Sequence, residues 1–448
     1  MQDGASNHCI VPGHLHHYTW ELFKIGVTIQ PYKDQTSSAM ADSTEWPRII
    51  AVRTFLVAPD PKKSIEDKPG HWLYYQEIAN PMSKYTKYKD NRDSWGVDVL
   101  GHFCVEIEAS DGTKGFAIGH GGYVGCFLTE QHFKRFLLDA DPRDTNTIWD
   151  QMYRGSQNYG RRGITIMIIS VIDLALWDLL GKIRGEPVYK LIGGQTKDHL
   201  TAYCTGPYPD IARQQGFHGS KVALPYCPTE SNSLQKNYDV LAEHRRKAGP
   251  GYPLMVDCYM SLNISYAIKL ITKCADLDID WWEEVLSPDD TEGYATLRQA
   301  LPGVKWASGE HEYTRYGYRK LVESRLLDLL QPDVMWCGGM TELLRIATHA
   351  AAYDIPIVPH GTSHYTVHFC MSQPNAPLIE YVAYSPDGKS VAPVHGDFFV
   401  KEPLPTDGIV KPEEFSKPGF GLEISPHVKL VPARELFKPF YDIFGEHQ

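Results

Sequence analysis

The sequence lacks an uninterrupted apolar run of about 18 residues, the length that a membrane-spanning helix needs. Its longest apolar stretch, ITIMIISVIDLALWDLLG at 164–181, is interrupted by Asp173 and Asp178. This stretch predicts a buried core helix, and we expect no membrane partner.

The chain also lacks paired cysteine motifs. Its nine cysteines include no CxxC pair, and an odd, scattered set does not suit a disulfide framework or a cysteine zinc site. Such thiols are typical of a reducing compartment, so we expect a cytoplasmic protein. The net charge of −11 comes without a basic stripe, which excludes nucleic acid as an expected partner.

The first forty residues contain no arginine and no signal-type apolar segment, so they resemble neither a mitochondrial transit peptide nor a secretory signal. A convincing strand pattern begins only near Ile49. We therefore expect Met40 to be the natural start and residues 1–47 to be a poorly ordered N-terminal extension.

Residues 48–127 have an antiparallel strand pattern. RIIAVRTFLVA is rich in β-formers, and FCVEIEA and GFAIG flank the turn Ser110-Asp111-Gly112, which predicts a hairpin. Helices are expected at 129–155 and 161–184. The long irregular segment 71–98 contains six aromatic residues between charged ones. It is either a loop that covers a substrate or a surface loop packed for stability.

From about residue 197, short β-rich segments alternate with helical ones and give eight strand candidates. This alternation predicts parallel strands with helical crossovers, and eight units predict a (β/α)-barrel. Five ionisable residues recur at the expected strand ends with spacings of 26, 27, 23 and 27 residues: Asp257, Glu283, Glu310, Asp333 and His360. Side chains at the carboxyl ends of barrel strands converge on one face, so we expect these five to meet.

Asp257, Glu283 and Glu310 are carboxylates on successive strands. Three clustered carboxylates repel one another unless a cation lies among them, and oxygen ligands suit Mg²⁺. For any single acid, an ion pair with a barrel lysine remains an alternative. Asp333 beside His360 would orient the imidazole and raise its basicity, which makes His360 a candidate general base.

The order of these five residues resembles the enolase superfamily in its mandelate racemase-like branch. DLALWDLLGKIRGEPVYKLIGG resembles the junction between the capping domain and the barrel of that family, and PGFGLEI resembles its C-terminal return to the cap. At a finer level, eight motifs resemble the L-rhamnonate dehydratase family: NPMSKY, NRDSWG, MVDCYMS, SGEH, QPDVMWCGG, VPHGTSHY, SPDGKS and KPGFG.

The resemblance implies an α/β fold, a (β/α)-barrel of modified TIM type with an N-terminal α+β capping domain. The implied divisions are a cap at 48–195, a barrel at 196–395 and a C-terminal segment at 396–448 that returns to the cap. Relatives also suggest a homo-oligomer.

The family's functional residues carry over to this sequence by motif. Asp257, Glu283 and Glu310 would bind Mg²⁺, and His360, oriented by Asp333, would be the base. Glu380 would face the carboxylate of the substrate or its enediolate. Arg92 would contact the substrate carboxylate, and His71 and Lys84 are weaker candidates for substrate contacts.

One departure from the family pattern bears on the reaction. Many members have Lys-x-Lys on the second barrel strand, but GSKVAL carries Lys221 followed by Ala223 in place of the second lysine. A racemase needs a base on each face of the α-carbon, so a single base favours a dehydratase. Lys221 could help neutralise the substrate carboxylate.

The expected reaction is loss of water from a small sugar acid, L-rhamnonate in the first place, by abstraction of the C2 proton and syn elimination of the C3 hydroxyl. Alternatives are dehydration of another acid sugar, epimerisation, and a catalytically silent barrel with a binding role. In the pair Glu283-Glu284, the spacing favours Glu283 as the metal ligand. Glu284 is expected to point away from the metal, because neighbours on a strand face opposite sides.

Overall fold

A computed structural model describes residues 46–57, 72–75, 78–89, 95–436 and 438. The predicted extension lies outside these residues except for its last two positions, and so do the predicted substrate contacts His71 and Arg92. The proposed domain boundaries at 47, 195 and 395 stay a prediction.

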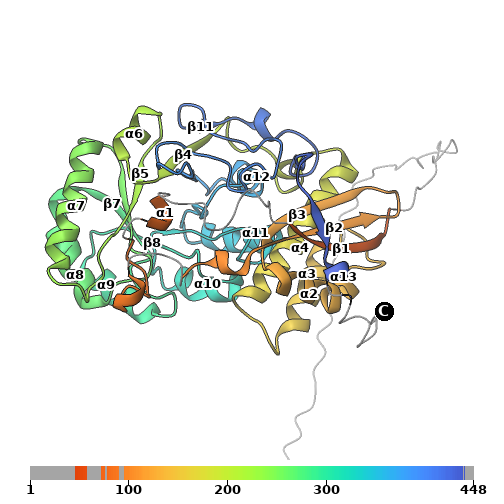
Figure 1. Cartoon of the computed structure of the whole chain (residues 1–448), viewed down its shortest axis with the longest axis horizontal. Helices are drawn as coiled ribbons and strands as arrows, with labels where there is room; N and C mark the ends of the chain where they lie inside the picture. Colours follow the sequence, from red (N-terminus) through yellow and green to blue (C-terminus); the bar gives the residue numbers. More distant parts are fainter. Residues whose placement is uncertain (1–45, 58–71, 76–77, 90–94, 437, 439–448) are drawn as a thin grey trace, which may run out of the picture. The chain divides into compact units, whose positions relative to one another are not determined.

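A four-stranded antiparallel sheet forms the first layer, in the order β12-β1-β2-β3. Its strands are β1 (Ile49–Val57), β2 (His102–Ala109), β3 (Lys114–His120) and β12 (Leu430–Pro432). The predicted hairpin is confirmed: β2 and β3 pair from His102 with His120 to Glu108 with Lys114. Gly112 makes the turn possible, because its φ of 84° is a conformation that L side chains rarely adopt. The last strand, β12, lies beside the first, β1 (Figure 1).

The helical elements up to the barrel are α1 (Trp72–Tyr75), η1 (Thr86–Tyr88), η2 (Val97–Leu100), α2 (Gly122–Gln131), η3 (Phe133–Phe136), α3 (Thr145–Ser156), α4 (Ile164–Arg184) and α5 (Val188–Leu191). The prediction of one helix over 129–155 is wrong. A helix cannot run through Asp139, whose φ is 63°, and Pro142 restricts the residue before it.

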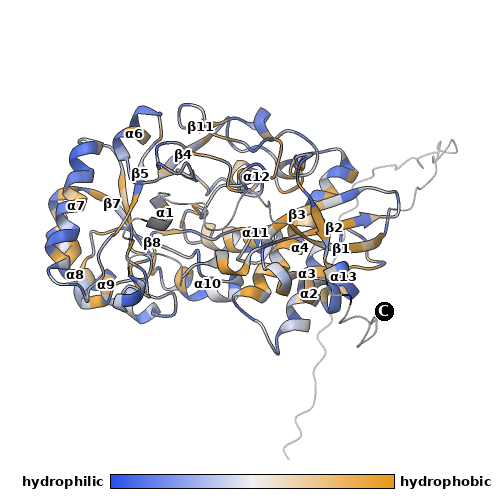
Figure 2. Cartoon of the chain, in the orientation of Figure 1, coloured by the Kyte–Doolittle hydropathy of each residue, from blue (hydrophilic) through white to orange (hydrophobic). Residues whose placement is uncertain are grey.

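The long apolar stretch forms α4, and its predicted burial is confirmed. Its length and composition would allow it to cross a membrane, but 89% of its apolar window is buried inside the protein. In Figure 2, the orange of hydrophobic residues is prominent on this helix and on the adjoining strands. Asp178 on α4 accepts hydrogen bonds from the amides of Phe116 on β3 and Phe420, both at 2.9 Å, so α4 joins the sheet to the C-terminal segment.

Seven parallel strands form the barrel wall, in the order β10-β4-β5-β6-β7-β8-β9. They are β4 (Leu200–Thr205), β5 (Ser220–Ala223), β6 (Leu254–Asp257), β7 (Ile279–Glu283), β8 (Trp306–Ser308), β9 (Leu329–Leu330) and β10 (Leu378–Val382). The remaining predicted strand, IPIVPHG, contributes a single parallel bridge from Ile357 to Leu330. Short β11 (Ile409–Val410) pairs antiparallel with β4.

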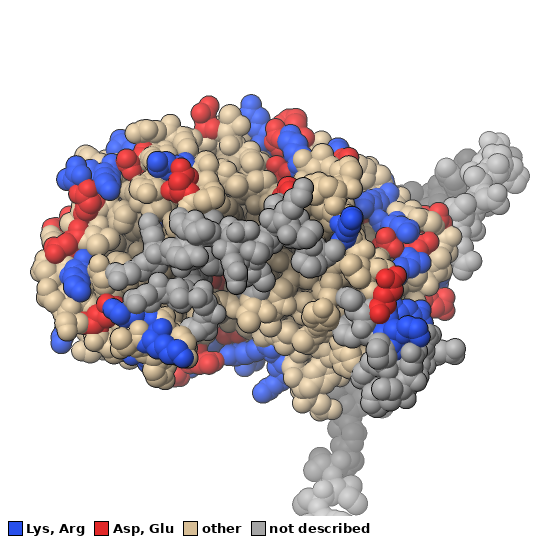
Figure 3. All heavy atoms as spheres, in the orientation of Figure 1, with Lys and Arg blue, Asp and Glu red and all other residues tan. Residues whose placement is uncertain are grey.

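Helices connect the barrel strands in sequence order, as Figure 1 shows in green to blue. They are α6 (Pro209–Gln214), α7 (Ser233–Ala248), α8 (Ile264–Lys273), η4 (Ala275–Leu277), α9 (Thr291–Ala300), α10 (Thr314–Glu323), α11 (Gly339–Ala351) and α12 (His364–Ser372). Elements η5 (Pro412–Phe415) and α13 (Ala433–Leu436) follow. Side-chain caps start two of these helices: Asn263 accepts from the amide of Tyr266, and Asp290 from that of Gly293. On the face drawn in Figure 3, acidic and basic side chains are interspersed over the barrel helices.

An apolar cluster formed by alternate strand residues fills the barrel: Tyr203, Met255, Trp281, Ala307, Leu329 and Val358. Side chains two positions further along a strand share its face. Asp257 and Glu283 therefore point inward just beyond Met255 and Trp281, at the carboxyl ends of their strands. This periodicity positions the candidate site.

The described parts of the segment 71–98 lie over those carboxyl ends. The indole of Trp72 donates to the carbonyl of Ala383 at 2.6 Å, and the amide of Ala79 donates to the carbonyl of Leu224 at 2.8 Å. The ring of Trp95 lies 5.7 Å from that of Tyr259. These contacts support the interpretation of the segment as a cover over the strand ends.

Candidate active site

Three buried carboxylates surround one buried lysine where the barrel strands end, and a fourth buried carboxylate, Glu310, lies at the same end. The amino group of Lys221 on β5 lies 2.8 Å from Glu380 and 3.8 Å from Asp257, and it forms a hydrogen-bonded ion pair with Glu283. Asp257 and Glu283 are paired neighbours on β6 and β7. Glu310 follows two residues after β8 and is also buried.

The electrostatics of this cluster show an excess of negative charge. Burial raises the pKa of Asp257 well above its usual range, and the charges of Glu283, Glu310 and Glu284 raise it further. The charge of Lys221 lowers this pKa but does not outweigh the other effects. Burial raises the pKa of Glu283 to about 7, opposed by Lys221 and assisted by Glu380 and Glu310. One lysine does not balance these acids, and the oxygen donors around them fit a hard divalent cation.

Glu380 on β10 is held by three donors. It accepts from the amino group of Lys221, from the backbone amide of Gly361 at 2.8 Å and from the hydroxyl of Thr205. Burial opposes its ionisation, but Lys221, His360 and the amide of Gly361 together lower the pKa of Glu380 to about 2. Glu380 is therefore a carboxylate at neutral pH and holds the loop that follows His360.

His360 and Asp333 form the predicted pair. Nδ1 of His360 lies 2.9 Å from Oδ2 of Asp333, and Oδ1 of Asp333 accepts from the amide of Met335 at 2.7 Å. Nε2 of His360 lies 3.6 Å from Oε2 of Glu310. The imidazole keeps 26% of its surface exposed while Asp333 and Glu310 are almost covered, so His360 is the member that a substrate can reach.

The pKa of His360 is set by opposing effects. Burial lowers it, but Glu310, the hydrogen bond to Asp333 and the charge of Glu380 raise it well above its usual range. Burial raises the pKa of Asp333 against the opposing contact with His360. The structure thus brings together all five residues whose spacing predicted convergence, and Lys221 and Glu380 with them.

The expectation that Glu284 points away from the metal stays a prediction, although its carboxylate remains among the residues of the site. Glu284 has a φ of 42°, which ends the strand alternation, and its carboxylate turns to His311. Nδ1 of His311 lies 2.8 Å from Glu284 and 3.4 Å from Glu310. One ligand atom from each of Glu284, Glu310 and His311 lies within 4.8 Å of the others, a spacing that could hold a metal ion.

Sequence reasoning missed His311. Burial lowers its pKa, but Glu284 and Glu310 outweigh this and raise it to about 9. The signal that could have found it is its place directly after Glu310, at the same strand end.

Two predicted substrate contacts differ from expectation in their surroundings. Lys221 is 1% exposed, and its amino group pairs with carboxylates of the site. Lys84 is exposed, and its amino group lies 5.0 Å from the ring centre of Tyr85. Among the described residues, the structure does not bring Lys84 to the carboxylates.

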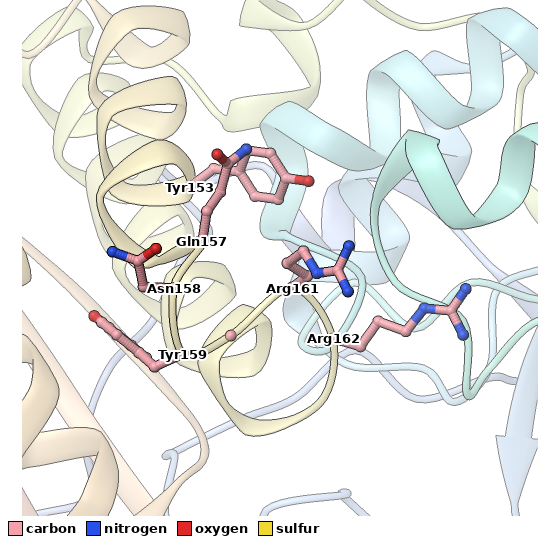
Figure 4. Close-up of a pocket in the computed structure, with 7 residues that line it drawn as sticks. Tyr153, Gln157, Asn158, Tyr159, Arg161 and Arg162 are labelled. Carbon is pink, nitrogen blue, oxygen red and sulfur yellow. The ribbon is translucent and has the colours of Figure 1, made fainter.

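A separate open depression lies where α3 ends and the chain turns into α4. Its lining is Tyr153, Gln157, Asn158, Tyr159, Gly160, Arg161 and Arg162 (Figure 4). Arg162 is paired with Asp289 at 2.8 Å and lies 3.5 Å from Glu312. None of the predicted site residues lines this depression, so it is distinct from the strand-end cluster.

Comparison with known families gives matches over both layers of the structure. The family described as enolase C-terminal domain-like matches residues 210–428. The mandelate racemase / muconate lactonizing enzyme N-terminal domain matches residues 101–193.

Solved structures agree with these matches. Rhamnonate dehydratase from Gibberella zeae complexed with Mg is 56% identical, with a TM-score of 0.85, over 88% of this chain and 98% of that chain. L-rhamnonate dehydratase from Gibberella zeae is 56% identical, with a TM-score of 0.84, over 89% and 99%. A racemase from Streptomyces coelicolor A3(2) with bound magnesium is 26% identical, with a TM-score of 0.66, over 84% and 97%.

Proposed function

Because the chain belongs to the enolase superfamily, with the N- and C-terminal domains of its mandelate racemase and muconate lactonizing enzyme group, we propose that it is a Mg²⁺-dependent dehydratase of sugar acids that acts on L-rhamnonate. The observation that carries this proposal is the His360–Asp333 pair, with the free nitrogen of the imidazole facing the carboxylate cluster. The 56% identity to rhamnonate dehydratase supports the choice of substrate.

Asp257, Glu283 and Glu310 are the residues that would hold Mg²⁺. The ion supplies electrostatic stabilisation of the negative charge that develops on the substrate when the proton beside its carboxylate leaves. The excess of carboxylates over lysine in this cluster supports the assignment.

His360 would act first as the base. Asp333 occupies Nδ1, so Nε2 of the neutral imidazole is the atom left to accept the C2 proton of the substrate. The C2–H electron pair then forms the enediolate of the carboxylate. A positioned general base of this kind contributes roughly 10²–10⁴-fold to the rate.

The same imidazole would then act as the acid. It returns the proton to the C3 hydroxyl, the C3–O bond breaks, and water leaves as the C2–C3 double bond forms. Proton removal and water loss on one face make this a syn elimination. The resulting enol tautomerises to 2-keto-3-deoxy-L-rhamnonate.

The surroundings of Lys221 support a reaction with one base. Lys221 is surrounded by carboxylates, and Ala223 has no titratable side chain at the other lysine position of the family pattern. We propose that Lys221 balances the charge of Glu283 and Glu380. Its predicted contact with the substrate carboxylate stays a prediction, as do the contacts of Arg92, His71 and Lys84.

A panel of acid sugars tests the function. The protein is incubated with Mg²⁺ in deuterated water, and products are followed as keto acids and by deuterium at C2. L-rhamnonate should give one keto acid with loss of one water. Deuterium at C2 in a product that keeps the hydroxyls on C2 and C3 would instead identify an epimerase. If no acid sugar of the panel changes, a binding role is favoured.

We further propose a cytoplasmic homo-oligomer that acts on a small molecule. The eight described cysteines are all free and buried, which supports a reducing compartment. The oligomeric state rests on the resemblance to the family.

A further inference from the structure

Trp336 contacts three histidines and has no role in the proposed reaction. Its ring centre lies 5.2 Å from that of His360, 5.5 Å from that of His311 and 5.9 Å from that of His120. The indole nitrogen donates to Nδ1 of His120 at 3.2 Å. Trp336 is 5% exposed, so the indole fills the space between these rings.

The backbone of Trp336 belongs to the same turn as Asp333. The amides of Trp336 and Cys337 donate to the carbonyl of Asp333 at 3.0 and 2.8 Å. Gly338, the next residue, is fixed from the other layer of the protein. Its amide donates to the hydroxyl of Ser170 at 2.9 Å, and its carbonyl accepts from the indole of Trp149 at 2.7 Å. The indole and the carboxylate that orients His360 are therefore parts of one rigid turn.

The contact with His360 adds what the hydrogen bond to Asp333 does not supply. One hydrogen bond at Nδ1 fixes a point of the ring, but rotation about the last side-chain torsion of histidine is broad. A flat indole packed against the imidazole restricts that rotation and fixes the direction of Nε2. A misplacement of about 1 Å at a reacting group costs roughly 10²-fold in rate.

The hydrogen bond to His120 links this arrangement to the antiparallel sheet. His120 is the last residue of β3, and it pairs across the sheet with His102, whose ring centre lies 4.6 Å away. Because Trp336 donates, Nδ1 of His120 must accept, and the proton of a neutral His120 is on Nε2.

We propose that Trp336 is a positioning residue that holds the imidazoles of His360 and His311 and ties both to His120 of the capping sheet. The inference rests on the proposed function for its kinetic consequence, but the contacts themselves can be tested without turnover.

Three variants separate the parts of this arrangement. Trp336→Leu removes the aromatic face and the donor, Trp336→Phe removes the donor and keeps a smaller aromatic ring, and His120→Leu removes the acceptor together with the imidazole ring. Trp306→Phe is the matched control. Trp306 is fully buried on β8, and its indole nitrogen has no hydrogen-bond partner within the described part of the chain.

With L-rhamnonate and saturating Mg²⁺, kcat of Trp336→Leu should fall on the order of 100-fold while KM changes less than about threefold. Trp336→Phe and His120→Leu should each lose about fivefold, the value of one neutral hydrogen bond. Trp306→Phe should change kcat much less than Trp336→Leu, because it leaves the contacts of Trp336 with His360 and His311 in place. A kcat for Trp336→Leu within threefold of the parent, or an equal loss in Trp306→Phe, would overturn the inference.

Imidazole signals of histidine-labelled protein give the second readout, with His360 and His311 assigned from His360→Asn and His311→Asn. Both signals should move in Trp336→Leu, because the indole ring current is lost, and less in Trp336→Phe. Unmoved signals refute the contact. If the parent dehydrates nothing but the signals move, the proposed function fails and the positioning holds. If Trp336→Leu does not fold, parent-like kcat in both Trp336→Phe and His120→Leu overturns the link to the cap.

Discussion

His360 is the one residue to which the proposed reaction assigns both proton transfers. The amide of asparagine can keep the hydrogen bond to Asp333 but cannot take up a proton at neutral pH. We therefore predict that His360→Asn lowers kcat by about 10⁴-fold, the upper end of what a general acid–base group contributes. Mg²⁺ affinity, measured by calorimetry, should fall by no more than the roughly 10- to 100-fold that loss of an outer-shell partner costs, because His360 lies beside Glu310 and is not itself a proposed ligand.

A control separates loss of the base from loss of the fold. The thermal unfolding midpoint of His360→Asn should match that of the parent, since the histidine is partly exposed. Substantial remaining dehydration in the folded variant would show that another group removes the C2 proton.

Glu283 and Glu284 are competing candidates for the same cation. Glu283 lies beside Asp257 on the neighbouring strand. Glu284 instead forms a possible metal-binding group with Glu310 and His311. We predict that Glu283→Gln weakens Mg²⁺ binding more than Glu284→Gln. Loss of an outer-shell partner costs roughly 10- to 100-fold in metal affinity, which sets the expected range for Glu284→Gln. Calorimetry on both variants decides, and the reverse order would move the ligand assignment to Glu284.

At this scale, the sequence predicted which residues meet but not how each one points. The spacings of 26, 27, 23 and 27 residues work because each βα unit returns the chain to the same barrel end. The direction of Glu284 could not be predicted, because a positive φ in a glutamate is rare and depends on the tertiary fold. An ion pair with a barrel lysine was expected only as an alternative for each acid, and Lys221 could not be identified as that lysine because its partners come from strands far along the chain.

Asp173 on helix α4 contacts the start of α11, which directly follows the turn that carries Asp333 and Trp336. The carboxylate accepts from the amide of Thr341 at 2.9 Å in the first turn of α11, while its other oxygen has no partner in the described residues. Burial raises the pKa of Asp173 to about 7, and the hydrogen bonds from Thr341 and the charge of Arg345 offset this in part.

This raised pKa predicts a stability that falls as the pH rises. The unfolded chain releases the proton of Asp173 near the ordinary pKa of about 3.9, while the folded chain keeps it until about pH 7. Between these two pKa values the unfolded state binds fewer protons than the folded state. The free energy of unfolding therefore decreases as the pH rises through this range, by about 1.4 kcal/mol in total for each unit by which the two pKa values differ.

Asp173→Asn should remove this dependence. The free energy of unfolding in urea is measured for the parent and for the variant between about pH 4.5 and 7.5. This window of about three units follows from the shift in the pKa of Asp173. The parent should lose stability relative to the variant as the pH rises. A difference between the two that is independent of pH would show that Asp173 has an ordinary pKa in the folded protein.

Elements with a strong internal pattern were predicted well, and breaks within a pattern were not. The apolar period of 164–181 and the turn Ser110-Asp111-Gly112 are local signals, and both elements formed as expected. The stretch 129–155 has helical composition on both sides of Asp139 and Pro142. The local backbone there divides it into α2, η3 and α3, which composition does not reveal.

The whole molecule should respond to the metal through its stability. A ligand that binds only the folded state stabilises it by about 2.7 kcal/mol at 100 times its Kd. We predict that Mg²⁺ raises the apparent unfolding midpoint over that in chelator, measured by differential scanning fluorimetry. Asp257→Asn should lose most of this difference. An equal rise in parent and variant would mean that the ion acts elsewhere.

The pairing of β12 with β1 joins the two ends of the described chain in one sheet. During synthesis, β1 emerges before the whole barrel and β12 after it. The outer edge of β1 therefore stays unpaired until the barrel has been translated, and an exposed strand edge invites pairing with other chains. A ribosome that stalls within the barrel would hold a nascent chain whose cap is incomplete on that edge, which makes this interval the one in which chaperone protection matters most.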